Sequence, residues 1–458
     1  MKVELKFTLL IILVFISRLP FIDGGFGVEE DAWGFGLNAL LMAKSGVYEY
    51  ARIPGHPVLE YVYCFLPLKE AWLFNLCTAI MSTLAVVFFY LICKKLKAPA
   101  FMGALMLAFT PVFYVNSSNA MDYNWALCFM LAAFYFLMKK KVNLSALMIA
   151  LAVGSRITSG AILLPLSLYL FMMGGKNKAL VAKYILFTLV LCGLVFSPVL
   201  LRYGKDFFGY VNQFGYPPVI KSIFKASIGV WGALGFMLLC VSIVVAVKIF
   251  LKNHYERRDK PALLVCISSN LLFLISYAYE PHKAAYLISI VPFVLLFVLV
   301  LNDNKKLILG TLCALVISCF FTGINLADEN RSSTPSSWSV VASVNNQKVA
   351  FDALRGNVID DYDKRKVRMS YAGEVIAKSI ALPGKNAIIC GYWLNNILMQ
   401  QRGYEKPELL YLHYIDEKTI ADLKANGFSV YIIPGQEKFN DQCWNATFTY
   451  KSVTPLFQ

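Results

Sequence analysis

Eleven apolar segments of helical length occupy the first 325 residues, and they constrain the fold more than any other feature of the chain. A helix needs about 20 residues to cross the hydrocarbon core of a bilayer. The weakest pair is 143–156 and 157–173, where polar residues around Arg156 interrupt the run, so two short helices or one broken helix fit equally. The pattern predicts a polytopic, mainly helical membrane protein. The segments are 7–22, 72–93, 99–115, 121–138, 143–156, 157–173, 183–200, 227–251, 261–279, 284–301 and 307–324.

The amino-acid composition agrees with this interpretation. Hydrophobic residues make up 58% of the chain and charged residues 16%, whereas soluble domains carry about 45–50% apolar and roughly 25% charged residues. Intrinsic disorder, a coiled coil and a disulfide-rich scaffold are therefore excluded. The net charge of +15 suits a nucleic-acid partner in principle, but the excess lies in short loops between apolar segments, where it indicates membrane topology.

Lysine and arginine concentrate in alternate loops. If all eleven segments cross the membrane, these basic loops fall on one side, which the positive-inside rule makes cytoplasmic. No small-residue cleavage site follows the first segment, so we expect an uncleaved anchor. The other side receives residues 23–71 and the C-terminal domain, which predicts a multi-pass plasma or inner membrane protein with that domain outside the cytoplasm. The basic loops are 94–97, 139–141, 176–183, 252–260 and 305–306.

The sequence predicts three parts: a transmembrane domain (1–325), a linker (326–340) and a C-terminal domain (341–458). In the last part, residues 386–391 and 428–433 are typical of buried strands, and residues 417–426 of a helix between them. This order predicts a small α/β domain. It contains no glycine-rich phosphate loop and no clear catalytic group, so we interpret it as a lid or docking domain.

The cysteines do not suggest a metal site. Nine of the eleven lie in or beside apolar segments, where cysteine behaves as a small hydrophobic residue, and neither C-x-x-C nor a zinc-ligand spacing occurs. Cys390 and Cys443 lie in the C-terminal domain. They can pair in an oxidising compartment, but burial in a strand explains Cys390 equally well.

Three consecutive carboxylates, Glu29, Glu30 and Asp31, follow the first apolar segment, and an amphipathic run (33–44) comes after them. A carboxylate here can deprotonate an acceptor hydroxyl or ligate a divalent cation; the alternative is a solvated acidic turn. The three cannot all face one cavity. In a helix neighbours diverge by about 100°, whereas in an extended segment Glu29 and Asp31 face the same side.

A second motif, Arg52-Ile-Pro-Gly-His56-Pro, lies in the same outer segment. Its prolines lack a backbone donor and restrict the residue before them, so it forms a rigid bend and not a helix interior. Further polar residues lie on the same predicted side. Ionisable groups at such places mark functional sites by default, and together they predict a site for a charged substrate, although Asp122 and Arg156 also suit ordinary helix interfaces. These residues are Asn116, Asn119, Asp122, Tyr123, Asn124, Arg156, Glu280, His282 and Lys283.

The acidic residues after the first segment, followed by Pro-Gly-His-Pro before the second, resemble the GT-C superfamily of membrane glycosyltransferases. This superfamily includes the protein O-mannosyltransferases and the lipid A aminoarabinose transferases. Residues 150–158 and 280–292 are similar to the family's fifth-span region and late outer loop, and eleven spans with an extracytoplasmic C-terminal domain also fit. The resemblance implies sugar transfer from a polyprenyl-phosphate donor, with a carboxylate of the first outer loop as base.

The resemblance also implies roles for individual residues. Asp31 ranks first as the base and Glu30 second, and the Glu-Glu-Asp triplet leaves the register of the family's acidic pair open. His282 and Lys283 would bind the donor phosphate, in a cationic patch with Arg156 close to Arg202 or Lys205. The expected substrate-binding set is Glu29, Arg52, His56, Asp122, Tyr123, Arg156, Arg202, Glu280, His282 and Lys283.

This assignment is physically reasonable. Arginine and lysine match phosphate oxygens, and a base on the opposite face of the anomeric carbon supports in-line displacement with inversion. The predicted partners are a polyprenyl-phosphate sugar and a lipid, glycan or protein acceptor. No cofactor is expected beyond a possible divalent cation, and no nucleic acid.

Two other functions fit part of the sequence. A ligase or polymerase of lipid-linked glycans would share the donor and the topology. A transporter would place polar groups near mid-bilayer and repeat broken helices in two halves, whereas here the polar groups gather at one predicted surface and no internal repeat is visible.

Overall fold

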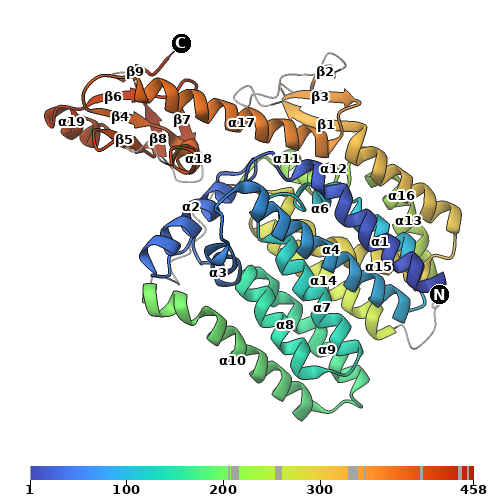
Figure 1. The fold of residues 1–458 in the computed structure, drawn as a ribbon. Coiled ribbons are helices and arrows are strands. Elements are labelled where there is room, and N and C mark those ends of the chain that lie inside the picture. Colours follow the sequence, from blue (N-terminus) through green and yellow to red (C-terminus); the bar gives the residue numbers. More distant parts are fainter. Residues whose placement is uncertain are drawn as a thin grey trace.

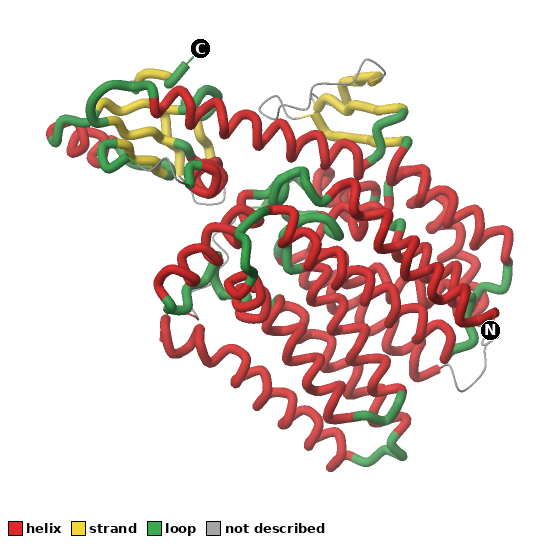
Figure 2. The backbone as a smooth tube through the Cα atoms, viewed as in Figure 1, coloured by secondary structure: helices red, strands yellow, loops and turns green. Residues whose placement is uncertain are grey.

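The structure is a computed structural model, which describes residues 2–204, 207, 216–252, 260–327, 339–344, 347–402, 406–441, 446–450 and 453–457. A bundle of helices forms its larger part, and the described strands lie beyond one end of this bundle (Figure 2). The long helix α17 (Asn357–Ile380) runs from that end of the bundle to a small sheet domain (Figure 1). The predicted mainly helical fold with a small C-terminal α/β domain is confirmed.

Five helical segments of the described chain are long and apolar enough to cross a membrane, and three shorter apolar ones accompany them. The protein is therefore a multi-pass membrane protein, while the count of eleven spans stays a prediction. The five are α4 (Ala71–Lys95), α10 (Lys178–Tyr203), α13 (Ala233–Leu251), α14 (Lys260–Tyr279) and the pair η5 (Ala284–Ile290) with α15 (Val291–Leu301). The shorter ones are α7 (Tyr123–Met138), α8 (Val142–Ser155) and the pair η2 (Ile157–Ile162) with α9 (Leu163–Met173). Other helices of this part are α1 (Lys2–Arg18), η1 (Leu19–Phe21), α5 (Ala100–Ala108), α6 (Pro111–Val115), α11 (Val219–Ala226), α12 (Ile228–Trp231) and α16 (Lys305–Phe320).

The structure corrects several segment boundaries. Residues 99–115 form two helices, because Thr110 precedes a proline and is extended (ψ 124°). Residues 143–173 form two helices joined at the extended Arg156, which is one of the two predicted alternatives. The last segment was extended too far: its helix ends at Phe320, and residues 322–327 form a strand.

The acidic first outer loop and the basic loops lie at opposite ends of the helices. Helix α4 begins next to the first outer loop, where the Asn75 side chain donates to the carbonyls of Ile22 and Gly25, and it ends at Lys94 and Lys95. In the same way α7 ends before loop 139–141 and α10 begins within loop 176–183. These basic loops therefore lie at the end of the bundle opposite the sheet domain (Figure 1). Which end faces the cytoplasm stays a prediction.

The C-terminal part contains more regular structure than the sequence indicated. A three-stranded antiparallel sheet, ordered β1-β3-β2, precedes α17, and a four-stranded parallel sheet, ordered β5-β4-β6-β9, follows it. The predicted strands and the predicted helix correspond to β4, β6 and α19. The bounds are β1 (Thr322–Ala327), β2 (Ser339–Val344), β3 (Gln347–Ala353), β4 (Asn386–Ile389), η6 (Gly391–Trp393), α18 (Leu394–Gln400), β5 (Leu409–Leu412), α19 (Glu417–Ala425), β6 (Ser429–Ile432), β7 (Lys438–Asp441), β8 (Ala446–Thr449) and β9 (Thr454–Pro455).

Strand β4 is buried on both faces, which explains its continuous apolar sequence. Ile388 packs with Val375 of α17 on one face, and Ile389 packs with Ile420 of α19 on the other. Cys390, at the end of β4, is also buried. The predicted partner Cys443 lies outside the described residues, as does most of the predicted linker.

Two short helices in the first outer segment position the candidate site. They are α2 (Glu30–Ser45) and α3 (Pro57–Phe65). The amphipathic run predicted for residues 33–44 lies within α2. Its Trp33 is buried and donates from Nε1 to the carbonyl of Gly27 at 2.9 Å. This bond and those from Asn75 fix the loop that leads to the acidic triplet.

Candidate active site

A buried carboxylate, Asp122, lies at the centre of the site, immediately before α7. One of its oxygens is 3.1 Å from a terminal nitrogen of Arg52, and the other is 2.9 Å from Arg156. The Nδ1 atom of His56 lies 3.6 Å from the second oxygen. A fully buried carboxylate requires such partners, so Asp122 fixes two arginines that come from distant parts of the chain.

A second group of ion pairs joins the acidic loop to the late outer loop. Lys283 Nζ lies 2.6 Å from Glu29 Oε2 and 2.9 Å from Asp31 Oδ2, and Asp31 Oδ2 also accepts from Arg52 at 2.6 Å. Arg52 thus connects Asp31 with Asp122. The two groups together form what we call the ion cluster, three carboxylates and three cations: Glu29, Asp31, Asp122, Arg52, Arg156 and Lys283.

The backbone explains which carboxylates of the triplet converge. Glu29 is extended (φ −78°, ψ 143°) and precedes α2, which begins at Glu30. Glu29 and Asp31 therefore both reach Lys283. Glu30 instead accepts from the backbone N–H of Asn395 in α18, at 3.4 Å. The structure thus brings Glu29 and Asp31 together at Lys283. Glu30, the residue ranked second as base, points instead to the C-terminal domain.

The environment of these carboxylates sets their pKa values apart. Burial alone would raise the pKa of Asp31, but the charges of Lys283 and Arg52 outweigh it and hold that pKa well below its usual range. Burial raises the pKa of Glu30 to about 7, against the opposing hydrogen bond from Asn395 and the charge of Arg368. At neutral pH Asp31 is thus ionised, whereas Glu30 is partly protonated.

The predicted bend presents His56 to the ion cluster. Its Nδ1–H donates to the carbonyl of Ser155 at 2.7 Å, so Nε2 is the acceptor of the hydrogen bond from Arg52 Nε at 3.1 Å. Burial lowers the pKa of His56 to about 4. The imidazole is therefore neutral and orients Arg52 instead of adding charge.

Glu60, in the first turn of α3, fixes the bend. Its carboxylate accepts from the backbone N–H groups of Ala51 (2.8 Å) and His56 (3.0 Å) and from the hydroxyl of Tyr48. Burial raises the pKa of Glu60 to about 7. The position of Glu60, three residues after Pro57 and in the first turn of a helix, could have indicated that it binds backbone N–H groups of the bend.

Aromatic rings enclose Arg156. Its guanidinium lies 4.7 Å from the ring centres of both Tyr123 and Tyr286, a distance typical of cation–π contacts. The hydroxyl of Tyr123 is buried and has no hydrogen-bond partner among the described residues. Tyr123 was predicted from the sequence; Tyr286 was quoted there only as part of a motif.

The remaining predicted residues lie at the edge of the cluster or away from it. Arg202, at the end of α10, pairs with Glu49 at 2.5 Å, is 47% exposed and has no ion pair with a carboxylate of the ion cluster among the described residues. Lys205 lies outside the described residues. Glu280 and His282 lie on the turn before Lys283, and the carbonyl of His282 accepts from Lys225.

Sequence reasoning missed the contribution of the C-terminal part. Arg365 of α17 is fully buried; it donates to the carbonyl of Ser118 at 2.8 Å and pairs with Asp361 at 3.0 Å. Arg368, one turn later, donates to the carbonyl of Val28 at 3.0 Å. No sequence signal indicates these contacts, because arginines one turn apart are also typical of a solvated helix face.

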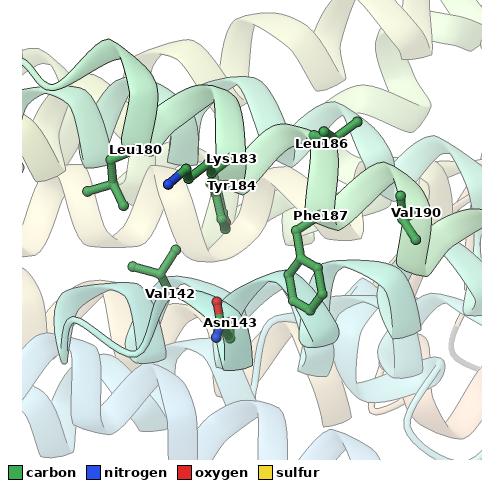
Figure 3. A pocket seen from close by; sticks show the side chains of 8 residues that line it. All are labelled: Val142, Asn143, Leu180, Lys183, Tyr184, Leu186, Phe187 and Val190. Atoms are coloured by element: carbon green, nitrogen blue, oxygen red, sulfur yellow. The ribbon is translucent and has the colours of Figure 1, made fainter.

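Two clefts differ in their relation to the ion cluster. The α2 cleft, of about 490 Å³, borders α2 next to the acidic triplet; its residues are Gly34, Leu37, Asn38, Leu41, Lys44, Ser45, Glu49, Tyr50, Ala51 and Asn395. The other, of about 510 Å³, lies between α8 and α10, and Phe187 points across it from α10 toward α8 (Figure 3). Lys183 lines it near the start of α10, so it lies toward the basic-loop end, away from the ion cluster.

No group of three or more His, Cys, Asp or Glu side chains among the described residues is arranged to hold a metal ion. The carboxylates of Glu29 and Asp31 instead surround the ammonium group of Lys283.

Comparison with known proteins identifies a fold and a family. No curated protein matches the sequence. The crystal structure of ArnT from Cupriavidus metallidurans bound to undecaprenyl phosphate aligns with a TM-score of 0.57 at 12% identity, over 91% of this chain and 87% of that chain. ArnT is a GT-C glycosyltransferase, so the expected GT-C-like fold is confirmed. The EpsG family model matches residues 60–336 of the 458 residues, a stretch that includes Asp122, Arg156 and Lys283. The chain belongs to the EpsG family.

Proposed function

We propose that this protein is a membrane glycosyltransferase that transfers a sugar from a polyprenyl-phosphate donor to an acceptor at the outer membrane surface, with Asp31 as the base. The observation that carries the proposal is the ion cluster, in which Asp31 contacts two cations at the end of the bundle where the C-terminal domain lies. The EpsG membership and the ArnT-like fold support the broader class, a transferase or polymerase of lipid-linked glycans.

The donor phosphate fits the cations. The ArnT structure contains undecaprenyl phosphate, which has the phosphate and polyprenyl parts of such a donor. In this chain Arg52, Arg156 and Lys283 would contact the phosphate oxygens, since charge-assisted bonds to phosphate are among the strongest that side chains make. Lys283 and Arg52 would then neutralise Asp31 less, and its pKa would rise toward a value suitable for a base.

The reaction is a displacement at the anomeric carbon. Asp31 accepts the proton of the acceptor hydroxyl while that oxygen bonds to the anomeric carbon. The bond from this carbon to the phosphate oxygen breaks, and polyprenyl phosphate leaves with the electron pair, held by the three cations. Attack opposite the leaving group inverts the anomeric centre.

Asp31 suits this role better than Glu30 for a geometric reason. The anomeric carbon is one bond from the phosphate oxygen, so the base must lie near the cluster that holds the phosphate, on the side of the anomeric carbon away from the leaving oxygen. Asp31 contacts two cations of this cluster, whereas Glu30 contacts the C-terminal domain.

Two other functions, a glycan polymerase and a transporter, are compared with this glycosyltransferase assignment. EpsG is a polymerase family, which favours a polymerase whose acceptor is itself a glycan; the donor site and the base would be the same. A transporter is disfavoured, because it would place its ionisable groups near mid-bilayer, and the ion cluster lies at the ends of the helices.

The decisive experiment compares Asp31→Asn with Glu30→Gln. Membranes from cells that make the native donor would be mixed with the acceptor-bearing envelope fraction of cells lacking this protein, and sugar transfer would be followed with radiolabel. We expect Asp31→Asn to lower turnover by about 10²–10⁴-fold, with binding of undecaprenyl phosphate retained in native mass spectrometry. Wild-type turnover in Asp31→Asn would refute the role of Asp31. Loss in Glu30→Gln alone would assign the base to Glu30.

The proposed orientation has its own test. A single cysteine placed at the exposed Lys378, in a variant without reactive native thiols, should react with a membrane-impermeant reagent in intact cells. Labelling only after lysis would place the C-terminal domain, and the ion cluster with it, in the cytoplasm.

A further inference from the structure

The α2 cleft lies between α2 and the C-terminal domain, and none of the ion-cluster residues lines it. One side of α2 and the segment Glu49–Ala51 form its floor and wall, and Asn395 from the C-terminal domain borders it. Its volume of about 490 Å³ falls within the ~300–1,000 Å³ of sites for small molecules.

The cleft begins about one helical turn beyond the proposed base, which is not among its lining residues. Gly34 and Asn38 follow Asp31 by three and seven residues, a spacing that places them on the same face of α2. On the other wall, Ala51 immediately precedes Arg52, whose guanidinium contacts Asp31 at 2.6 Å. A molecule lying along α2 in this cleft would therefore have one end about one helical turn from Asp31.

A glycine keeps this end of the cleft open. A Cβ atom at Gly34 would lie 3.2 Å from Nδ2 of Asn395 and 3.8 Å from the carbonyl oxygen of Ala51. Because Gly34 has no side chain, a narrow space remains between Asn395 of the C-terminal domain and Ala51 of the cleft wall. A larger side chain at this position would fill that space.

The lining combines an apolar surface, to which Leu37 and Leu41 contribute, with several polar groups. It offers the amide of Asn395, the hydroxyl of Ser45, the ammonium of Lys44 and the carboxylate of Glu49. Asn38 is buried, and its amide nitrogen donates to the carbonyl of Glu49 at 2.9 Å. Glu49 is itself fixed by Arg202 and by the hydroxyl of Tyr203. Tyr50 adds an aromatic ring, which packs on the ring of Tyr203 at 4.2 Å between centres.

We propose that the α2 cleft binds the saccharide acceptor, so that its reacting hydroxyl extends to Asp31. This inference rests on the proposed function and adds the class of the acceptor and the place where it binds. An amide and a carboxylate pair with the many hydroxyls of a sugar, and the ring of Tyr50 offers an apolar surface to its C–H face. A polymerase, the function associated with the EpsG family, likewise extends a glycan.

The main test fills the cleft. Gly34→Leu places a side chain between Asn395 and Ala51, and we expect it to abolish transfer to the envelope fraction described above while binding of undecaprenyl phosphate is unchanged. The matched control is Gly373→Leu in α17, where a Cβ atom meets nothing within 4 Å; it should transfer sugar like the wild type.

A second pair of variants covers the case that Gly34→Leu does not fold. Tyr50→Ala should raise by roughly tenfold the amount of acceptor fraction needed for half-maximal transfer, with an unchanged maximal rate, and Tyr50→Phe should restore the wild-type value. A purely structural role of Tyr50 would lower the maximal rate instead.

The outcomes separate the two proposals. If Asp31→Asn is inactive and both Gly34→Leu and Tyr50→Ala behave like the wild type, the cleft does not bind the acceptor and the proposed function stands. If Asp31→Asn is active, the proposed function fails first. A transferred label that resides on protein and not on glycan would also overturn the saccharide assignment.

Discussion

Replacing Asp122 by asparagine tests whether the ion cluster holds the two arginines in place. The Asp122 side chain is fully buried, and those of Arg52 and Arg156 are 22% and 14% exposed. The wild-type cluster balances three negative with three positive charges, and neutral His56 cannot compensate for a lost carboxylate. Asparagine keeps the shape and leaves one excess positive charge.

Removing one partner of a buried ion pair costs about 3–5 kcal/mol. At about 2 °C per kcal/mol, the value for larger domains, the thermal unfolding midpoint should fall by roughly 6–10 °C. The assay is intrinsic fluorescence of the detergent-purified protein during heating, with the exposed Asp303→Asn as the control. A midpoint within about 1 °C of the wild type would refute the reasoning.

The same variant makes a second, independent measurement possible. Undecaprenyl phosphate supplies a negative charge, so its addition should raise the midpoint of Asp122→Asn by more than that of the wild type. An equal rise in both proteins would show that the phosphate binds elsewhere than among these arginines.

Three further predictions concern the surroundings of the cluster. Lys283→Ala should weaken undecaprenyl phosphate binding by about 1.5–3 kcal/mol in native mass spectrometry, whereas Arg202→Ala, which removes an exposed pair, should not; equal effects would remove Lys283 from the phosphate site. Because the folded pKa of Glu60 (about 7) lies above its ordinary 4.5, Glu60 favours folding below about pH 4.5 and loses this contribution as the pH rises through 7. The free energy of unfolding that Glu60 contributes falls by about 2 kcal/mol between pH 5 and 7.5. Glu60→Gln should therefore flatten the decline of the melting temperature over this range, and an unchanged slope would contradict this. Arg365→Met, which leaves buried Asp361 without its partner, should increase hydrogen exchange in residues 23–31 compared with the exposed control Lys378→Met; equal exchange would contradict the docking role of α17.

The sequence was most informative where one residue property repeats along the chain. Apolar segments predicted the bundle. Basic loops 94–97, 139–141 and 176–183 fall together at one end of it, because α4, α7 and α8 each have one end near the site and the other at one of the first two loops, and α10 begins in the third. Strand β4 was found from its uninterrupted apolar run. Helix α17 was missed, because its polar, charged sequence buries only a narrow stripe and its core-facing residues pack on a sheet that follows it.

The sequence indicated which residues belong to the site, but not which of them form ion pairs with one another. Arg52, Asp122 and Lys283 were expected near one surface, yet only the fold determines that Arg52 contacts both Asp31 and Asp122. The grouping of Glu29 with Asp31 depends on where α2 begins, a boundary that local sequence does not specify to one residue. The partner of Arg202 could not be predicted either, because a basic residue at a helix end is compatible with any acidic neighbour, and here that neighbour is Glu49.

The contacts of α17 have a consequence for biogenesis. The loop with Glu29 and Asp31 is synthesised within the first tenth of the chain, whereas Arg365 and Arg368, which bind the carbonyls of Ser118 and Val28, are synthesised more than 300 residues later. Nascent chains released before α17 would lack both of these contacts. The loop that carries the proposed base would then be held by α17 only near the end of translation.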